Sequence, residues 1–357
     1  MNILHTETLK GWGGEQNKVI NEMVLLRELG HNVYLICNPN SKIAKKAKDL
    51  GFEVTELSMN KKNFFKTVPF FLKFIKEKNI DIVFTHGHTD TVIGALASKF
   101  SSKKPKFIRE RHNLFPVNSF LSRQLHKRLA DKVCVLSEAI RDYFLSIGVR
   151  EEKLFILPSV IDIEKFDKTK STFRDEFNIP SDATVVGMFT SLYRKKGVYD
   201  FIEVVKNIIH KYKNVYFVFG GECRRSVGEV IQETFKNEKR VILTGYREDA
   251  ANVMRGFDIF VFPSYSEGLG TVLLEAMASK LPSVVYNQKP MSDLIKDGER
   301  GLCASYKDVK DLQTKIEKLI NEPDFAEKLG KNAYKYVSDN YTMPVLKNRL
   351  KELLEQL

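Results

Sequence analysis

Two glutamates eight positions apart, Glu267 and Glu275, flank the segment Gly268-Leu-Gly-Thr-Val-Leu-Leu274 in the second half of the chain. A predicted buried strand at 257–263 runs into the loop that carries Glu267. Residues 269–278 have helical character, which places Glu275 about one turn into a helix. In an open parallel sheet, ligands bind at the carboxyl ends of the strands. Free amides at a helix start suit phosphate oxygens, and carboxylates accept hydrogen bonds from sugar hydroxyls. A ligand with both a diphosphate and several hydroxyls would therefore satisfy the whole segment.

Two other loops could contact phosphate. Gly13 and Gly14 leave room for a close backbone approach, and the helix that begins at Glu15 points its positive end there. The basic run Ser191-Leu-Tyr-Arg-Lys-Lys-Gly197 follows a predicted strand of the second half. An ordinary tight turn and a solvated basic turn are the alternative interpretations. Trp12, the only tryptophan, could stack on a sugar ring or pack as a hydrophobic staple.

The elements that position these loops alternate between short apolar strands and helical stretches, which is typical of parallel sheets with helices on both faces. After a strand that starts near the N-terminus, further strands are predicted at 33–37, 80–85, 107–109 and 133–136, and again at 184–189, 215–219, 241–244, 259–262 and 283–286. The fold class is therefore α/β, with two doubly wound, Rossmann-like domains in tandem that face a ligand cleft. Residues 324–357 are predicted to be helical throughout.

Composition limits the possible classes of protein. A chain of 357 residues suits two domains. No apolar run reaches the ~18 residues of a membrane span, and no signal peptide precedes the first strand, so we expect a cytoplasmic protein. Four scattered cysteines indicate neither disulfides nor a zinc site, and all are expected to be buried: Cys37, Cys134, Cys223 and Cys303.

Positive charge is concentrated in the first half. Residues 1–170 contain 29 Lys/Arg and 19 Asp/Glu, a net charge of +10 out of +12 for the chain. No nucleic-acid-binding motif accompanies this excess, so nucleic acid is not an expected partner. The segment 60–78 interleaves five phenylalanines with six lysines, a pattern typical of a helix at an anionic bilayer surface. A core helix that packs its phenylalanines on the sheet is the alternative.

Four segments, in order, resemble the retaining glycosyltransferases of family 4, whose fold is called GT-B: Gly11-Trp-Gly-Gly14, Arg109-Glu-Arg-His112, the linker-like run 156–166, and the Glu-x7-Glu segment from Glu267 to Glu275. The resemblance covers nearly the whole chain. It departs from the family at Ser191, where an arginine is common. Arg194 or Lys195 could supply that missing charge.

The resemblance implies a role for each site residue. Glu267 would accept hydrogen bonds from the donor sugar, Glu275 from the ribose, and the amides of Leu269, Gly270 and Thr271 would contact the diphosphate. The remaining expected contacts are Lys196 and Arg194 on the diphosphate, Gly13 and Gly14 near it, His112 on the donor sugar or its phosphate, and Gly245 and Tyr246 around the nucleobase. His86-Gly-His88 is a weak metal pattern, and we expect it to line the cleft.

By the same resemblance, residues 1–165 form the acceptor-binding domain, residues 166–340 the nucleotide-sugar-binding domain, and residues 341–357 a helix that crosses back to the first. The implied reaction moves a hexose-type sugar from a nucleotide-diphosphate sugar, UDP-linked, to a hydroxyl of a membrane-associated glycolipid or cell-envelope polysaccharide, with retention of configuration and without a metal. The enzyme would be peripheral on the inner face of the plasma membrane. A nucleotide-sugar 2-epimerase and a non-catalytic nucleotide-sugar-binding protein are the alternatives.

Overall fold

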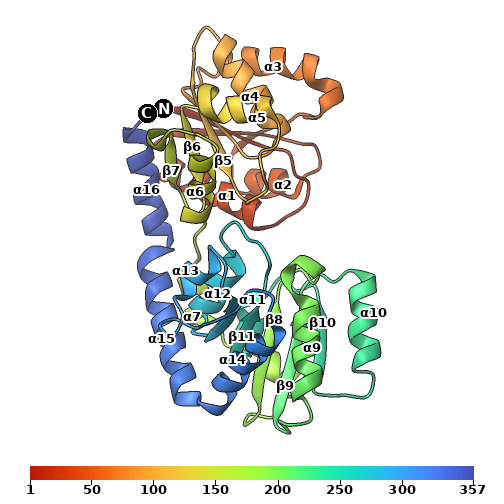
Figure 1. Cartoon of the computed structure of the whole chain (residues 1–357). Helices are drawn as coiled ribbons and strands as arrows, with labels where there is room; N and C mark the ends of the chain where they lie inside the picture. The colour runs from red at the N-terminus through yellow and green to blue at the C-terminus, as the bar shows by residue number, and fades with distance from the viewer. The chain divides into compact units, whose positions relative to one another are not determined.

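The computed structural model describes the backbone of residues 1–357 and every side chain except those of Lys61 and Leu121. The chain divides into two compact units (Figure 1). Unit 1 comprises Met1–Val160 together with Met343–Leu357, and unit 2 comprises Ile161–Thr342. Among the described residues, no helix combines the length and apolar composition that a membrane crossing requires.

Unit 1 is built on a parallel sheet of seven strands in the order β3-β2-β1-β4-β5-β6-β7. The strands are β1 (Asn2–Glu7), β2 (Asn32–Cys37), β3 (Glu53–Glu56), β4 (Ile82–Thr85), β5 (Lys106–Arg111), β6 (Lys132–Val135) and β7 (Leu154–Ile156). The helices are α1 (Gly14–Glu28), α2 (Lys42–Asp49), α3 (Phe64–Glu77), α4 (Thr89–Phe100), α5 (Phe120–Gln124), α6 (Glu138–Ser146) and α16 (Met343–Glu355). The strand order reverses between β1 and β4, which is the position where doubly wound folds bind ligands.

Unit 2 repeats this plan with six parallel strands in the order β10-β9-β8-β11-β12-β13. They are β8 (Thr184–Phe189), β9 (Val215–Gly220), β10 (Val241–Gly245), β11 (Ile259–Phe262), β12 (Ser283–Tyr286) and β13 (Leu302–Ala304). The helices are α7 (Ile163–Lys168), α8 (Phe173–Glu176), α9 (Val198–Ile208), α10 (Arg225–Thr234), α11 (Ala250–Met254), α12 (Thr271–Ala278), α13 (Met291–Ile295), α14 (Val309–Asn321) and α15 (Pro323–Asn340). Here the order reverses between β8 and β11.

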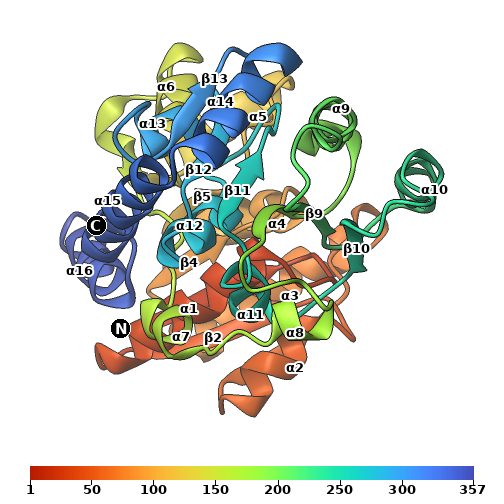
Figure 2. The same cartoon turned by 90° about the horizontal axis from the view of Figure 1, so that it is seen from below.

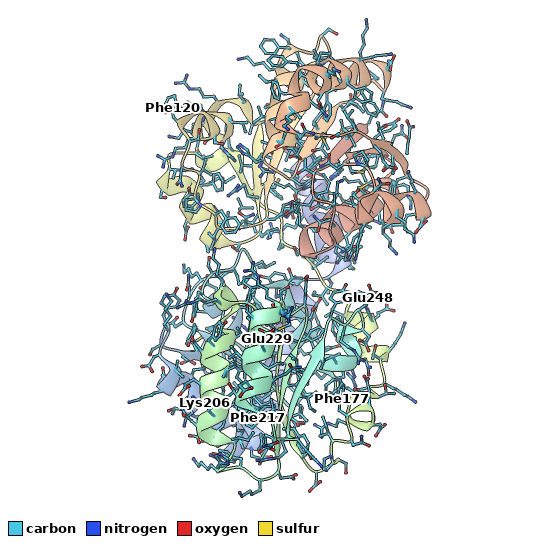
Figure 3. The ribbon with its side chains drawn as sticks, turned by 90° about the vertical axis from the view of Figure 1, so that its right-hand side faces the viewer. Phe120, Phe177, Lys206, Phe217, Glu229 and Glu248 are labelled. Atoms are coloured by element: carbon cyan, nitrogen blue, oxygen red, sulfur yellow. The ribbon has the colours of Figure 1, made fainter. Side chains whose placement is uncertain are left out.

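Helices α9, α10 and α14 cover one face of the unit 2 sheet and share one apolar core with it (Figure 2). Each of these helices is amphipathic. Figure 3 labels Lys206 on α9 and Glu229 on α10, both exposed, and Phe217 on β9, which is fully buried in the shared core. The strands are apolar along their length because both faces of a parallel sheet are covered.

The prediction of two doubly wound α/β domains is confirmed. The strands missed from the sequence, β3, β7 and β13, have three or four residues and all lie at an edge of a sheet, where pairing on one side only requires no long apolar run. The domain boundary falls after Val160 and not after residue 165, because α7 belongs to unit 2, where it packs on α12.

The prediction of one uninterrupted C-terminal helix is wrong. Helix α15 ends at Asn340 and α16 starts at Met343. Pro344 has no amide hydrogen to donate to the carbonyl of Asn340, and its ring would clash with that carbonyl in a continuous helix. The carbonyl of Tyr341 accepts a hydrogen bond from the amide of Ile161 (2.8 Å). Helix α16 packs on α1 within unit 1, and Lys347 pairs with Glu28 at 2.8 Å. The prediction for the cysteines is wrong at Cys223, which is only half-buried.

Gly197 has backbone φ +75°, and a Cβ there would lie 2.0 Å from the carbonyl oxygen of Pro263. We predict that Gly197→Ala lowers the free energy of unfolding by about 3–5 kcal/mol, which adds the strain of a left-handed alanine to the cost of overpacking. Gly298→Ala is the matched control, because Gly298 has the same φ with nothing within 4 Å. It should cost only about 1–2 kcal/mol. Urea unfolding measures both, and equal losses would show that the contact with Pro263 is not required.

Candidate active site

Two loops of unit 2 meet at the carboxyl edge of its sheet, beside the reversal between β8 and β11. The loop after β8 contains the short turn η4 (Arg194–Lys196), and the loop after β11 contains Glu267. The ammonium of Lys196 donates to the Oε1 atom of Glu267 at 2.6 Å, and the hydroxyl of Ser264 donates to the same oxygen, also at 2.6 Å. The structure therefore brings together two residues that are 71 positions apart in the sequence.

Backbone contacts hold these loops in register. The amide of Tyr265 donates to the carbonyl of Lys195 at 2.8 Å. The phenols of Tyr265 and Tyr286 both donate to the carboxylate of Asp200, in the first turn of α9, at 2.9 and 2.5 Å. These hydrogen bonds tie the start of α9 to the ends of β11 and β12. The two tyrosines and Asp200 belong to no sequence motif, so the sequence analysis missed them.

The start of α12 presents free backbone amides. Gly270 caps the helix with φ +82°. Within the part of the chain that the structure describes, the amides of Leu269, Gly270 and Thr271 have no hydrogen-bond acceptor. Unpaired amides and the positive end of the helix dipole favour an anion at this position. The expectation of a phosphate contact here is geometrically reasonable.

Glu275 lies one turn into α12 and is only partly exposed. Burial raises the pKa of its carboxyl to about 7, and Lys165 opposes this shift. A half-buried carboxylate without an ion-pair partner among the described residues is costly unless a ligand donates hydrogen bonds to it. Ribose hydroxyls would supply such donors.

The loop after β10 is shaped by Gly245, with φ +69°, whose carbonyl accepts a hydrogen bond from the amide of Gly221 at 2.9 Å. Tyr246 follows and is 58% exposed. The next residue, Arg247, is fully engaged in ion pairs with Glu176 and Asp249. Tyr246 is thus the residue of this loop that offers an open aromatic face.

Arg194 is exposed in the turn η4, and no ion pair forms to it among the described residues. It lies two residues from Lys196, so its charge remains available to a ligand. Arg224, after β9, lies 5.9 Å from the ring centre of Tyr193 and adds a further positive charge near this loop. The sequence analysis missed Arg224, which belongs to no motif.

In unit 1, Gly13 caps α1 with extended backbone, and both Gly13 and Gly14 are exposed. Trp12 is 39% exposed beside them. Burial, with the neighbouring carboxyl of Glu7, raises the pKa of Glu15 in the first helical turn to about 8. This carboxyl is therefore largely neutral at pH 7 and does not repel an anion that approaches the helix start.

His112 follows β5 and ends a chain of three histidines. The Nδ1 atom of His5 lies 3.1 Å from the Nε2 atom of His86, whose Nδ1 atom lies 3.0 Å from the Nε2 atom of His112. Burial lowers the pKa of His5 to about 3 and holds the pKa values of His86 and His112 well below the usual range. All three rings are therefore neutral near pH 7, and each carries one N–H.

Three neutral rings can satisfy both hydrogen bonds only if their N–H groups point the same way along the chain. The Nδ1 atom of His112 is buried without a partner. It is a donor if the N–H groups point from His5 toward His112, and an acceptor if they point the other way. A sugar hydroxyl fits both cases because it donates and accepts. The expectation that His86 lines a cleft is wrong, since His86 is 2% exposed and lies inside this chain.

Beside the histidines, the ammonium of Lys18 is fully buried and donates to Glu22 and Glu110, the latter at 2.7 Å. Ligand-type atoms of His5, Glu22 and His86, and of His86, Glu110 and His112, lie within 4.8 Å of one another among the described residues. Such donors could bind zinc. However, burial and the charge of Glu110 raise the pKa of Glu22 well above its usual range, so Glu22 holds a proton and Lys18 balances the charge of Glu110. Lys18 would also repel a second cation, so the cluster is better suited to a proton-ordered network. The sequence analysis missed Lys18, Glu22 and Glu110, which only the fold brings together.

Two family models match consecutive parts of the chain. The model described as "Glycosyltransferase Family 4" matches residues 12–165, and the model described as "Glycosyl transferases group 1" matches residues 169–336. The chain is a glycosyltransferase of the GT-B fold. The loops that meet at β8 and β11 in this glycosyltransferase lie inside the second match.

Among curated proteins, the glycosyltransferase is 27% identical over 336 residues to the N,N'-diacetylbacillosaminyl-diphospho-undecaprenol alpha-1,3-N-acetylgalactosaminyltransferase of Campylobacter jejuni, with 86% of this chain and 87% of that protein covered. It is 23% identical to the UDP-Gal:alpha-D-GlcNAc-diphosphoundecaprenol alpha-1,3-galactosyltransferase of Escherichia coli, with 98% and 96% covered. Solved structures share the fold. A glycosyltransferase from Rickettsia africae gives a TM-score of 0.89 at 20% identity over 99% and 97% of the two chains, and Anabaena HepE in complex with UDP and glucose gives 0.86 at 19% identity over the full length of both.

We predict that Glu275→Gln stabilises the protein at high pH. The folded pKa of about 7 exceeds the ordinary value of 4.5, so the wild type loses stability as pH rises between these values. The variant removes that loss, which is about 1–3 kcal/mol for a half-buried group. Urea unfolding should show a gain at pH 8 and almost none at pH 4.5, while Glu327→Gln, at an exposed surface pair with Lys331, should change little at either pH. A gain of the same size at both pH values would contradict the titration of Glu275.

Proposed function

We propose that this glycosyltransferase moves a hexose-type sugar from a UDP-sugar to a hydroxyl of a glycolipid or cell-envelope polysaccharide acceptor, with retention of configuration. The observation that carries the proposal is the pair formed by Lys196 and Glu267 at the sheet reversal of unit 2. The two relatives described above are named for acceptors linked to undecaprenol through a diphosphate, which supports an acceptor of that class.

The Lys196–Glu267 pair can exchange partners when a donor binds. Both side chains are only 12–17% exposed, so each needs a partner at all times. A donor diphosphate would take the ammonium, and the donor sugar hydroxyls would hydrogen-bond to the released carboxylate. Without a ligand, Lys196 and Glu267 therefore satisfy each other. With a donor bound, contacts to the diphosphate and the sugar hydroxyls would replace the ion pair.

Charge that develops on the departing diphosphate would be stabilised by Lys196, by the open amides at the start of α12 and by the nearby charge of Arg194. These groups make a metal unnecessary in our proposal. Retention rests on the resemblance to family 4. We favour a front-face reaction in which the leaving diphosphate helps to remove the acceptor proton.

We also propose that the enzyme is cytoplasmic and binds peripherally to the membrane that carries its acceptor. Helix α3 buries Phe71 and Phe74 in the core of unit 1, so part of the phenylalanine-rich segment is a core helix. Its outer face is different, since Phe65 is 89% exposed beside Lys62 and Lys66, with Lys73 and Lys76 also exposed. An exposed aromatic ring among lysines supports contact with an anionic bilayer.

The test is turnover with a panel of nucleotide sugars, first ranked by protection against thermal unfolding, with and without a short polyprenyl-diphosphate-linked sugar. Glycosyl transfer should require the acceptor, with only slow hydrolysis in its absence. Conversion of the donor without an acceptor would instead indicate the 2-epimerase alternative.

In the same assay, we predict that Lys196→Ala lowers kcat/KM by an amount equivalent to about 2–4 kcal/mol of lost transition-state stabilisation.

Two variants calibrate this loss. Arg194→Ala should cost a similar amount if Arg194 replaces the arginine absent at Ser191, and full activity would show that it does not. Lys206→Ala removes a surface lysine that pairs with Glu203 and should leave kcat/KM unchanged. Wild-type turnover by Lys196→Ala would remove the main support for the proposed donor site.

We predict that the protein sediments with anionic vesicles at low ionic strength and is only partly released by salt. Each lysine near the surface contributes about 1 kcal/mol, and inserted phenylalanine adds an unscreened apolar contribution. Changing Lys66, Lys73 and Lys76 to glutamate should abolish binding. The matched control changes Lys42, Lys45 and Lys46 of α2 to glutamate. These lysines are exposed on a helix with no exposed aromatic residue, so this variant should keep most of the vesicle binding. Equal loss in both variants would indicate binding through net charge alone, and wild-type protein in the supernatant would favour a soluble acceptor.

A further inference from the structure

The end of β5 directs its side chains to two different environments. Successive residues of a strand point to opposite faces of the sheet. Glu110 points to the face that holds Lys18. Arg109 and Arg111 therefore point to the opposite face, where they line a cavity of about 180 Å³ that lies wholly within unit 1. This volume is about 12 to 18 times the ~10–15 Å³ that one water needs, so the cavity can hold a polyatomic group.

The cavity is lined by cationic, imidazole, hydroxyl and amide side chains. Its polar lining residues are His88, Thr91, Arg109, Arg111, Asn118, Ser119, Ser122 and His126. No acidic residue lines it. Within the described part of the chain, neither Arg109 nor Arg111 forms an ion pair. The carboxylates that act on the charge of Arg109, Asp90 most strongly, do not line the cavity, so both guanidinium groups face it without a carboxylate in its wall.

Several polar nitrogen atoms in this wall lack hydrogen-bond partners. The Nε atoms of Arg109 and Arg111 and the Nε2 atom of His126 are buried without a hydrogen bond, although Arg109 and His126 are each only 4% exposed. Arg109 is held by a bond from its Nη1 atom to the carbonyl of Thr85 at 3.0 Å, and Arg111 by a bond from its Nη2 atom to the carbonyl of Phe115 at 2.7 Å. Fixed, buried and unpaired donors are costly unless a ligand accepts from them.

The pKa of His126 is a second indication of a positive electrostatic field inside the cavity. Burial, together with the charge of Arg109 and then of Arg111, lowers the pKa of His126 to about 3. The Nδ1 atom of His126 lies 2.6 Å from the carbonyl of Ser122, so this neutral ring carries its proton on Nδ1 and leaves Nε2 as an acceptor. The cavity thus offers two cations for an anion and one acceptor for a hydroxyl or amide N–H of the same ligand.

Exposed aromatic side chains lie next to the cavity in the sequence. Phe115 precedes the lining residue Pro116 and is 62% exposed, and Phe120 lies between Ser119 and Ser122 and is 71% exposed (Figure 3). Large exposed apolar side chains that border a polar site indicate contact with an apolar partner. An anionic group attached to a hydrocarbon chain matches this combination of cavity and rim.

We propose that the cavity between Arg109, Arg111 and His126 binds the diphosphate of a polyprenyl-diphosphate-linked acceptor, with Phe115 and Phe120 against the first prenyl units. The proposal rests on the proposed function for the acceptor class, and it adds the subsite that holds the charged group. The guanidinium groups donate to phosphate oxygens in the manner that makes arginine a common phosphate ligand. Binding here would place the acceptor in unit 1, separately from the Lys196–Glu267 pair in unit 2.

The test is titration calorimetry of the intact protein with farnesyl diphosphate, inorganic pyrophosphate and UDP. Farnesyl diphosphate should bind, and Arg111→Ala should weaken its binding by about tenfold to hundredfold, as expected for lost charge-assisted hydrogen bonds. Ser119→Glu adds a carboxylate at an exposed position of the cavity wall without removing a buried side chain. It should weaken binding at least as much, even if Arg111→Ala fails to fold.

Matched controls separate the subsite from general charge and from the donor site. Arg128→Ala removes an exposed arginine outside the cavity and should change farnesyl diphosphate affinity less than twofold. Arg111→Ala, Ser119→Glu and Arg128→Ala should all bind UDP with the affinity of the wild type. Phe120→Ser should weaken farnesyl diphosphate and not inorganic pyrophosphate, whereas equal affinity of the wild type for both ligands would contradict the lipid assignment.

Unchanged farnesyl diphosphate binding by folded Arg111→Ala and Ser119→Glu, or competition between farnesyl diphosphate and UDP for one site, would overturn the proposal. Transfer to a lipid-linked acceptor combined with either result would leave the proposed function standing and reject only the subsite. Specific farnesyl diphosphate binding without any glycosyl transfer would support the subsite and reject the proposed function.

Discussion

The backbone contact between Gly197 and Pro263 is the constraint on which the Lys196–Glu267 pair of this glycosyltransferase depends. The loops after β8 and β11 leave neighbouring parallel strands at the same edge of the sheet, but the edge alone does not bring their side chains within hydrogen-bonding distance. A Cβ on Gly197 would overlap the carbonyl of Pro263. Because glycine allows close approach of the two backbones, Lys196 reaches Glu267. The hydrogen bond from the amide of Tyr265 to the carbonyl of Lys195 then holds both loops together.

Unit 1 solves a different electrostatic problem with the same topology. Its sheet edge carries a buried ammonium, Lys18, between Glu22 and Glu110, and three neutral histidines that continue the hydrogen-bond network. The alternation of β5 separates this neutralised network from a cavity with an excess of positive charge. One strand end therefore contributes Glu110 to an ion-pair network on one face and two arginines to a cavity wall on the other.

The sequence predicts the parts of the site that are local. Glu267, Glu275 and the start of α12 lie in one short segment, so strand, loop and helix patterns place them without knowledge of the tertiary fold. Lys196 is predicted as part of a basic loop, but its contact with Glu267 follows only from the order of β8 and β11 in the sheet. The network of His5, Lys18 and Glu110 joins three elements of unit 1, and no spacing in the sequence relates them. A lysine on an apolar helix face reads as a solvated charge until the fold buries it.

The break between α15 and α16 has a consequence for the biosynthesis of the protein. Unit 1 is assembled from two separate stretches of chain, and the second, Met343–Leu357, is translated only after all of unit 2. Leu346, Leu350 and Leu353 of α16 are fully buried against the core that α1 shares. The apolar surface of α1 therefore remains uncovered until the segment beyond unit 2 has been synthesised. Chains that lack Met343–Leu357 would expose that surface to solvent, so the core of unit 1 depends on a segment that follows unit 2 in the sequence.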